Sequence, residues 1–378
     1  SQTVTGVQTC ALPICPAETT FTNCEFIGNA ATDDGGAITV YSSDASLTNS
    51  VILDGCTFSG NSTTENGGAL RMRGPGVGTI RDCEFLTNTA TATGMAGGAI
   101  YTEVAGRSVD IENSVFASNA ADDFGGAIYL NTDTADGSIV NCTFDDNLVN
   151  SDTSRAMVDL RPGTSLTIAN CIFSNTTNRG VSMVTSASVE PVLTNNLFFE
   201  ISDWDVWYSG AGYNGANIND IATASGNLAG DPNFAGGGDY HLQSPSFAIA
   251  NADAASAPST DIEGTTRPLP AGSAPDIGAY EETTIGEAIS AGPVGYVTIS
   301  GAGDQSGRDW ANAYPGLSAA LDDQNGTPFF SYDELWVTQG THTVVDQLTP
   351  SGIEIYGGFN GTESARGDRD WQNNTTTL

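Results

Sequence analysis

The chain of 378 residues carries 45 acidic residues against 11 basic ones, every basic residue is an arginine, and the formal net charge is −34. Such a charge repels phosphate groups, so nucleic acid and anionic membrane surfaces are not expected as partners. An apolar content of 39% is ordinary for a soluble protein, and the length allows two or three domains. The sequence predicts no membrane insertion within these residues.

The first segment, residues 1–15, does not follow the pattern of the rest of the chain. Val4 to Ile14 resembles the translation of a sequencing-library adapter, and Leu12 to Cys15 only faintly imitates a lipoprotein cleavage site. We therefore expect this segment to be foreign to the fold, with the natural N-terminus and any export signal missing.

Residues 16–230 repeat two short phrases at intervals of about 25 to 32 residues. The first phrase is a Cys, any residue, a Phe, two residues and an Asn. The second is Gly-Gly-Ala and an aliphatic residue, beginning at Gly35, Gly67, Gly97 and Gly125. A repeat of this length, rich in Asn, Gly and β-branched residues and without helical periodicity, predicts a stacked solenoid.

Each repeat contains three short runs of alternating apolar residues, which predict strands. Ile38 and Val40 would point into the coil, whereas Thr39, Arg71 and Tyr129 would lie outside. The inward parity changes just before each Cys, at residue types that enter the left-handed backbone region at low cost. These predicted corners are Asn23, Gly55, Asp82, Asn113, Asn141 and Asn170.

Each Gly-Gly pair supplies a second corner by the same reasoning. The pattern predicts an all-β fold, a right-handed parallel β-helix with three strands per coil and coils about 4.8 Å apart. Equivalent residues would then stack in ladders. The aromatic ladder is Phe26, Phe58, Phe85, Phe116, Phe144 and Phe173. The amide ladder is Asn29, Asn61, Asn88, Asn119 and Asn147.

A third ladder consists of Cys24, Cys56, Cys83, Cys142 and Cys171. We expect reduced thiols, because the Cβ vectors of stacked neighbours run parallel. A zinc site is not indicated, since no histidine accompanies these residues. Ser114 takes the cysteine position in one repeat.

Paired aspartates occupy three predicted loops: Asp33 and Asp34, Asp122 and Asp123, Asp145 and Asp146. They indicate either a solvated acidic surface, suited to an extracellular or saline environment, or Ca²⁺ binding between stacked loops. No other cofactor is expected.

Residues 231–282 carry a different series of motifs, which includes Asp231-Pro232-Asn233-Phe234, Gly238-Asp239-Tyr240-His241-Leu242 and Asp276-Ile277-Gly278-Ala279-Tyr280-Glu281. This series resembles the choice-of-anchor Q module that closes secreted bacterial β-helix proteins. The upstream Gly-Gly-Ala-Ile and Phe-x-x-Asn phrases resemble the repeats of polymorphic outer membrane proteins. The resemblance implies a pectin lyase-like β-helix at the bacterial surface or outside the cell.

Residues 283–294 have the composition of a linker, and residues 295–378 resemble the cap and first coils of a second β-helix. We expect strands at Tyr296 to Ser300, Leu335 to Val337 and Ile353 to Tyr356. A helix through Leu317 and Leu321 would plug the first coil, as in related β-helix proteins. We expect a truncation at Leu378, within a longer multi-unit chain.

Parallel β-helices include polysaccharide lyases and hydrolases, which use a basic residue beside acidic ones or a pair of carboxylates. The arginine candidates are Arg71, Arg73 and Arg81, with Glu65, Asp82 and Glu103 on nearby coils. Surface ion pairs are the alternative role for these arginines. Asp33 and Asp123 would lie about three coils, roughly 14 Å, apart, too far for one site. His241 and His342 are expected to be structural.

Trp204, Trp207 and Tyr208 would either stack on sugar rings or pack beneath the closing module. We expect a non-enzymatic secreted or cell-surface rod that acts as an adhesin or binds glycans, with glycans or surface proteins as partners. The alternative is a polysaccharide-active enzyme, either pectate lyase-like or a glycoside hydrolase. An outward cleft that contains an arginine with two or more carboxylates within about 5 Å across adjacent coils would favour it.

Overall fold

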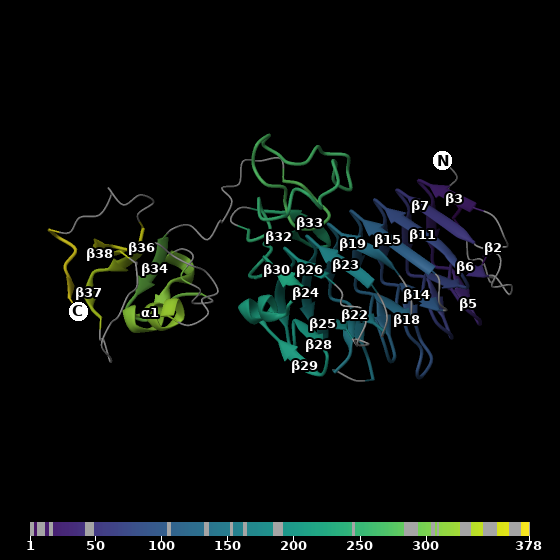
Figure 1. The fold of residues 1–378 in the computed structure, drawn as a ribbon, viewed down its shortest axis with the longest axis horizontal. Helices are drawn as coiled ribbons and strands as arrows, with labels where there is room; N and C mark the ends of the chain where they lie inside the picture. The colour runs from purple at the N-terminus through teal and green to yellow at the C-terminus, as the bar shows by residue number, and fades with distance from the viewer. Residues whose placement is uncertain are drawn as a thin grey trace. The chain divides into compact units, whose positions relative to one another are not determined.

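The structure is a computed structural model that divides into two compact units, residues 1–288 and 289–378. It describes residues 4–5, 12–14, 18–41, 49–103, 107–131, 136–151, 154–161, 165–183, 192–243, 246–282, 294–303, 307, 310–325, 334–342, 354–362 and 372–377. Figure 1 shows the strands of the first unit as a regular stack. The predicted linker, 283–294, lies almost wholly outside the described residues.

Three long sheets, parallel except for the last strand pair of sheet B, form the coil of the first unit, which confirms the predicted fold class. Sheet A contains β1 (Val4–Thr5), β4 (Glu25–Ile27), β8 (Thr57–Ser59), β12 (Glu84–Leu86), β16 (Val115–Ala117), β20 (Thr143–Asp145), β24 (Ile172–Thr176), β27 (Leu197–Ile201) and β31 (Leu228–Ala229). Sheet B contains β2 (Leu12–Ile14), β6 (Ile38–Tyr41), β10 (Leu70–Arg73), β14 (Ile100–Glu103), β18 (Ile128–Asn131), β22 (Ala156–Leu160), β25 (Arg179–Met183), β28 (Val206–Tyr208) and β29 (Ala211–Tyr213). Sheet C contains β3 (Glu18–Thr22), β7 (Ser50–Asp54), β11 (Gly76–Arg81), β15 (Arg107–Glu112), β19 (Asp136–Val140), β23 (Ser165–Ala169), β26 (Val192–Thr194) and β30 (Ala224–Ser225).

A fourth sheet of two-residue strands adds to the three that the sequence predicts. Sheet D contains β5 (Ala30–Ala31), β9 (Ser62–Thr63), β13 (Thr89–Ala90), β17 (Ala120–Ala121) and β21 (Leu148–Val149). β1 and β2 also pair in parallel with β4 and β6. Residues 4–5 and 12–14 therefore extend two sheets by one coil, whereas the sequence placed them outside the fold.

The coil turns at residues with positive φ. The corner between sheets C and A is confirmed at all predicted positions, with φ between 46° and 63°, and Asn195 continues it at 51°. The first glycine of each Gly-Gly pair is left-handed, as at Gly67, where φ is 73°. The second glycine is needed for space, because a Cβ on Gly68 would lie 2.0 Å from the carbonyl oxygen of Gly98.

A third left-handed corner is not predicted from the sequence. It separates sheet A from sheet D in the coils that have a sheet D strand, and in the next two coils the equivalent residue lies within β24 and β27. It lies two residues after each ladder Phe and is called corner AD below. Its members are Gly28, Gly60, Thr87, Ser118, Asp146, Asn175 and Glu200. Their only common property is a φ between 50° and 63°.

The predicted aromatic ladder fills the interior. Neighbouring rings from Phe26 to Phe173 stack with centroids 4.6 to 4.9 Å apart, and Phe198 extends the stack by 5.2 Å. The amide ladder is also confirmed. Each asparagine donates from Nδ2 to Oδ1 of the next at 2.8 to 2.9 Å. The two ladders hold successive coils in register.

The five ladder cysteines are buried free thiols, as expected. Side chains at this interior position accept hydrogen bonds from backbone N–H groups of the preceding coil. The Cys83 Sγ accepts the backbone N–H of Cys56 at 3.4 Å, and the Ser114 hydroxyl accepts that of Cys83 at 3.2 Å. In the coil after Cys171, Asn196 takes this position. Its Oδ1 accepts the backbone N–H of Cys171 at 3.0 Å.

A short 3₁₀ helix covers the end of the coil. In η1 (Gly215–Asp220), Ile218 is buried, and Ile218 and Ile221 pack with the coil core. The sequence assigned this closing role to residues 231–282. That module, which includes the hairpin of β32 (Phe234–Gly236) and β33 (Asp239–Leu242), instead lies along the flank of the coil. Its Ala279 is buried against Val115 and Ala117 of sheet A.

The module docks on the corner asparagines between sheets C and A. The Nδ2 groups of four successive corner residues donate to its backbone carbonyls at 2.7 to 3.1 Å. These bonds join Asn113 to Thr260, Asn141 to Asp276, Asn170 to Asp253 and Asn195 to Asn251. The left-handed corner thus also serves as a row of amide donors facing outward.

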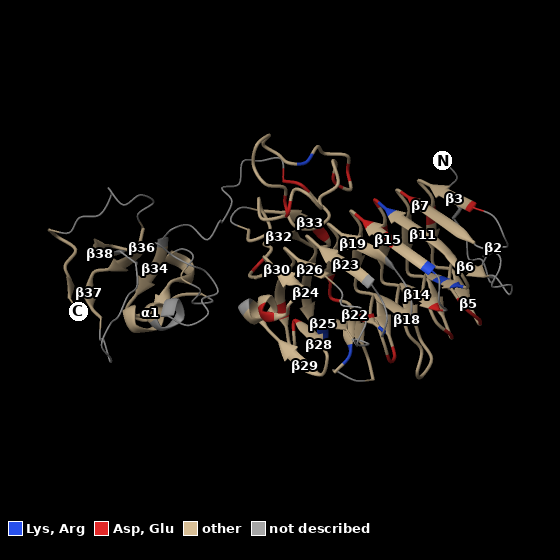
Figure 2. Cartoon of the chain, in the orientation of Figure 1, with Lys and Arg blue, Asp and Glu red and all other residues tan. Residues whose placement is uncertain are grey.

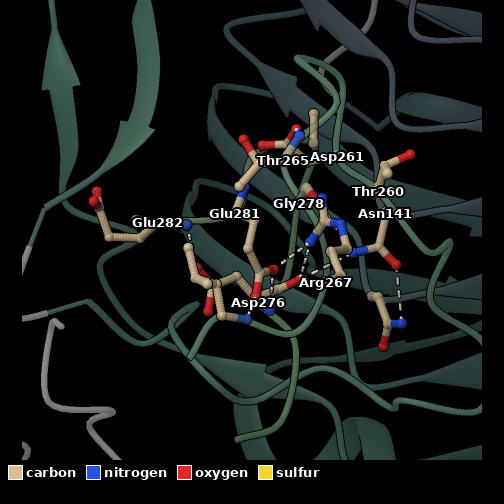
Figure 3. A network of polar contacts seen from close by, with 12 residues as sticks. Asn141, Thr260, Asp261, Thr265, Arg267, Asp276, Gly278, Glu281 and Glu282 are labelled. Carbon is tan, nitrogen blue, oxygen red and sulfur yellow. Dashed lines mark hydrogen bonds and ion pairs between the residues drawn. The ribbon is translucent and has the colours of Figure 1, made fainter. Parts of the chain in front are cut away.

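A buried ion pair organises the module itself (Figure 3). Arg267 Nη1 lies 3.0 Å from Glu281 Oε2, and the two side chains are 1% and 0% exposed. Arg267 also donates to the carbonyl oxygens of Asp276 and Gly278 at 2.8 and 2.9 Å. The charges are therefore paired and hydrogen-bonded, which a buried ion pair requires.

The second unit has the predicted parallel strands and helix. Its elements are β34 (Val294–Thr298), η2 (Trp310–Asn312), β35 (Tyr314–Pro315), α1 (Leu317–Asn325), β36 (Glu334–Thr338), β37 (Gly340–Thr341), β38 (Glu354–Phe359) and β39 (Thr376–Thr377). β35, β34, β36 and β38 form a parallel sheet. Leu317, Ala320 and Leu321 of α1 are buried, as a plugging helix requires.

Candidate functional site

The outer face of sheet B gathers candidates that lie far apart in the sequence. Strand register aligns one outward residue from each coil. In order these are Thr39, Arg71, Tyr101, Tyr129, Asp159, Ser182 and Trp207. Arg71 and Trp207, predicted for different roles, therefore belong to one surface, called the sheet B face below.

Arg71 forms ion pairs with two carboxylates from neighbouring coils. One guanidinium nitrogen contacts Asp34, and Nη2 lies 2.5 Å from Glu103 Oε2. Arg71 lies outside the coil, as predicted, but neighbouring side chains cover it and leave it 7% exposed. Tyr129 is likewise covered, in a small cluster with Ala96 and Tyr101.

This arrangement satisfies the distance condition set for an enzyme, but Arg71 itself is buried and does not open into an outward cleft. Both terminal nitrogens of the Arg71 guanidinium are already paired with carboxylates, as expected for a structural ion-pair network. Arg73 is more exposed and lies 3.9 Å from Glu103. Arg81 belongs to sheet C, where it pairs with Asp54 at 3.4 Å, and is therefore away from the sheet B face.

Asp159 is a functional candidate that sequence reasoning missed. It is 3% exposed on β22, and desolvation by burial raises its pKa to about 7. Coulombic attraction from Arg161, Arg155 and Arg179 acts in the opposite direction but is weaker than desolvation. The Ala-Met-Val-Asp-Leu segment gives no motif, because residues of other coils create this environment.

Arginines stack on aromatic rings around Asp159. The Arg155 guanidinium lies 3.8 Å from the Phe124 ring centroid, and that of Arg179 lies 3.9 Å from Trp207. Each is also paired with a carboxylate, Arg155 with Asp123 at 3.3 Å and Arg179 with Asp203 at 2.7 Å. Arginine stacked on an aromatic ring keeps its planar donors available at the ring edge.

The sheet B face holds five of the chain's eleven arginines, each with an acidic neighbour. Its arginines are Arg71, Arg73, Arg155, Arg161 and Arg179, and their acidic neighbours are Asp34, Glu103, Asp123, Asp159 and Asp203. Figure 2 shows acidic residues distributed over the first unit with few basic ones among them. A ligand meets less anionic repulsion here than elsewhere.

The candidate sugar-stacking residues Trp204, Trp207 and Tyr208 are half-buried. The Trp204 ring lies against the backbone of Gly212, and Trp207 stacks with Arg179. Tyr208 packs at the edge of the coil core. Because the module lies on sheet A and its corner, packing beneath it does not explain these residues. Stacking on sugar rings stays a prediction.

The predicted Ca²⁺ ligands are distributed over separate places. Asp34 and Asp123 are paired with arginines of the sheet B face. Asp122 accepts the backbone N–H of Gly94 at 2.6 Å. Asp145 and Asp146 lie at corner AD, where Asp145 accepts from Asn175 at 2.7 Å. Within the described ranges no three acidic, His or Cys residues converge as a metal site.

The two histidines have local partners. His241 Nδ1 lies 2.6 Å from Asp239 and Nε2 lies 3.3 Å from Glu263, and hydrogen bonds to these carboxylates raise its pKa against an opposing desolvation by burial. His342 is buried, with Nε2 3.0 Å from the carbonyl oxygen of Thr338. In the described part of the chain, no helix has the length and apolar character needed to cross a bilayer.

Comparison with protein-family models matches residues 14–198 to the right-handed β-helix region. With its stacked parallel sheets, the first unit is therefore a right-handed parallel β-helix. No curated protein matches the chain.

Proposed function

We propose that the first unit is a non-enzymatic, glycan-binding rod displayed outside a bacterial cell, and that the sheet B face is its binding surface. The observation that carries this proposal is the alignment of arginines, aromatic rings and carboxylates on one sheet. Sugar hydroxyls both donate and accept hydrogen bonds, so paired arginines and carboxylates suit them. Aromatic rings offer platforms for the apolar faces of sugar rings.

Aromatic rings that are at least partly accessible occur toward both ends of this face. Tyr41 is 38% exposed and its ring centroid lies 5.5 Å from the Arg73 guanidinium, while the half-buried Trp207 stacks on Arg179, whose side chain is 11% exposed. The acidic remainder of the surface favours neutral glycans over acidic ones. An adhesin-like role would follow from a rigid rod that carries such sites.

The proposal is tested by screening the intact chain against immobilised neutral and acidic oligosaccharides, then measuring affinity by calorimetry. Trp207→Ala and Arg73→Ala should each weaken binding by about tenfold, which is about 1.4 kcal/mol. Arg81→Ala is the matched control, because it removes an arginine–carboxylate pair from sheet C. Equal losses in the control, or the absence of any bound glycan, would refute the proposal.

Asp159 favours a second candidate, a polysaccharide-active enzyme. A carboxyl group whose pKa is about 7 is suited to donate a proton to a glycosidic oxygen at neutral pH. Asp159→Asn would then abolish release of reducing ends while leaving affinity within about twofold. If the wild-type chain cleaves none of the polysaccharides that it binds, this candidate is removed.

A further inference from the structure

Arg107 is a charged residue buried in the interior of the coil. It begins β15, and its side chain is 0% exposed and shares the inward orientation of Val109. Strand register places Arg107 beside Gly76 of the preceding coil, and the same register aligns Gly76 with the buried Asn49 one coil earlier. Because Gly76 has no side chain, the guanidinium has room to extend toward that coil, at the corner between sheets B and C that is called corner BC below.

No carboxylate among the described residues compensates this charge. The guanidinium donates from Nε to the Gly74 carbonyl oxygen at 2.9 Å and from Nη2 to that of Pro75 at 3.5 Å. The ion pairs in the described part of the chain do not include Arg107. Desolvation by burial lowers the pKa of Arg107 to about 10, so the guanidinium is still charged at neutral pH.

Three buried polar atoms without a hydrogen-bond partner lie around corner BC in the part of the coil that the structure describes. They are Arg107 Nη1, the Thr102 hydroxyl oxygen and Asn49 Oδ1. Thr102 is an inward residue of β14 on the same coil as Arg107, and Asn49 donates its backbone N–H at 3.0 Å to the Pro75 carbonyl that Arg107 also contacts. Buried polar groups are nearly always hydrogen-bonded, so three such atoms at one corner indicate a bound ion or water.

A small monovalent anion matches these groups. Arg107 offers a positive charge and an N–H donor, and the Thr102 hydroxyl can rotate to donate a second hydrogen bond. A water molecule beside the anion would donate both to the anion and to Asn49 Oδ1. Phosphate fits less well, because a single guanidinium would leave part of its charge buried and uncompensated. We propose that corner BC binds one small monovalent anion, such as chloride, between Arg107 and Thr102.

The test follows thermal unfolding of the intact chain while chloride replaces gluconate at constant ionic strength. Gluconate is too bulky for the interior of the coil but screens the net charge of −34 equally. Chloride at about ten times its Kd should raise the Tm by about 3 °C. Arg107→Met should remove this rise, because it replaces the guanidinium by an uncharged side chain. Arg81→Met is the matched control, since it makes the same replacement at an ion pair of sheet C that is partly exposed, and it should keep the rise.

Two further measurements apply even if Arg107→Met fails to fold. Thr102→Val keeps the charge and the shape, and should lower the affinity for chloride, taken from the midpoint of the Tm rise, by about tenfold. Crystals grown in bromide should show an anomalous peak within about 3.5 Å of Arg107 Nη1. A water without bromide at that position, an equal Tm in gluconate and chloride, an unchanged affinity in Thr102→Val or a full chloride response in Arg107→Met would overturn the proposal.

Discussion

Replacing Asn88 by alanine would test whether the amide ladder holds the coil together. The Oδ1 of Asn88 accepts from the backbone N–H and the Nδ2 of Asn61, at 3.0 and 2.9 Å. Its Nδ2 donates to the Phe58 carbonyl and to Asn119 Oδ1, both at 2.9 Å. All of these groups are buried in the coil, so the substitution removes four hydrogen bonds at once.

The expected cost follows from the groups left without their partner. A buried polar group that loses its only hydrogen-bond partner costs about 1 to 3 kcal/mol. The Asn61 N–H loses its partner, the Asn88 side chain, whereas the Phe58 carbonyl keeps a sheet hydrogen bond within the β8–β12 pair and the Asn61 and Asn119 amides keep other bonds. Asn88→Ala should therefore lower the free energy of unfolding by about 2 kcal/mol.

Urea unfolding followed by far-UV circular dichroism gives the measurement, with the slope in denaturant unchanged. The control is Asn217→Ala, which makes the same truncation at an exposed residue of η1 and should cost less than about 0.5 kcal/mol. If Asn88→Ala cost no more than the control, the ladder would not stabilise the coil and the reasoning would be wrong.

Three further predictions concern titration, the module and the core. The pKa values of Asp159 and Asp276 are raised to about 7, so between about pH 4 and pH 7 the folded state keeps protons that the unfolded chain releases. The free energy of unfolding should therefore fall as the pH rises through this range. Urea titrations at each pH should show a smaller fall for Asp159→Asn. Arg267→Ala strands the buried Glu281 carboxylate and should destabilise the module by about 3 to 5 kcal/mol, seen as faster proteolysis of residues 231–282 while the coil stays protected; unchanged cleavage would contradict it. Phe116→Ala should cost about 3 to 5 kcal/mol and Phe116→Leu clearly less, so equal melting temperatures for the two variants would argue against a packed aromatic ladder.

The coil could be predicted because its neighbours in space are copies of one another. Phe85 packs on Phe58 and Phe116, which occupy the same place in the neighbouring repeats. Aligning the repeats in the sequence is therefore enough to predict these contacts. The corner before each cysteine was recognisable for a related reason. Asn, Asp and Gly are the residues that adopt positive φ most easily, and the sequence uses only these three types there.

Corner AD was not recognisable, because Thr87, Ser118 and Glu200 have no residue type in common and share only their backbone conformation. Asp159 was missed because its burial and its arginine neighbours come from several coils. The resemblance of residues 231–282 to a closing module gave the order of its motifs. It did not indicate that outward-facing asparagines would hold the module against the flank.

That attachment has a mechanical consequence. The module grips four adjacent coils through Asn113, Asn141, Asn170 and Asn195, and a pull along the axis would have to slide it across all four anchor points together. A force that would otherwise separate two neighbouring coils is thereby distributed over several coil–coil contacts. The coils that the module contacts should therefore be the last part of the β-helix to unfold under tension.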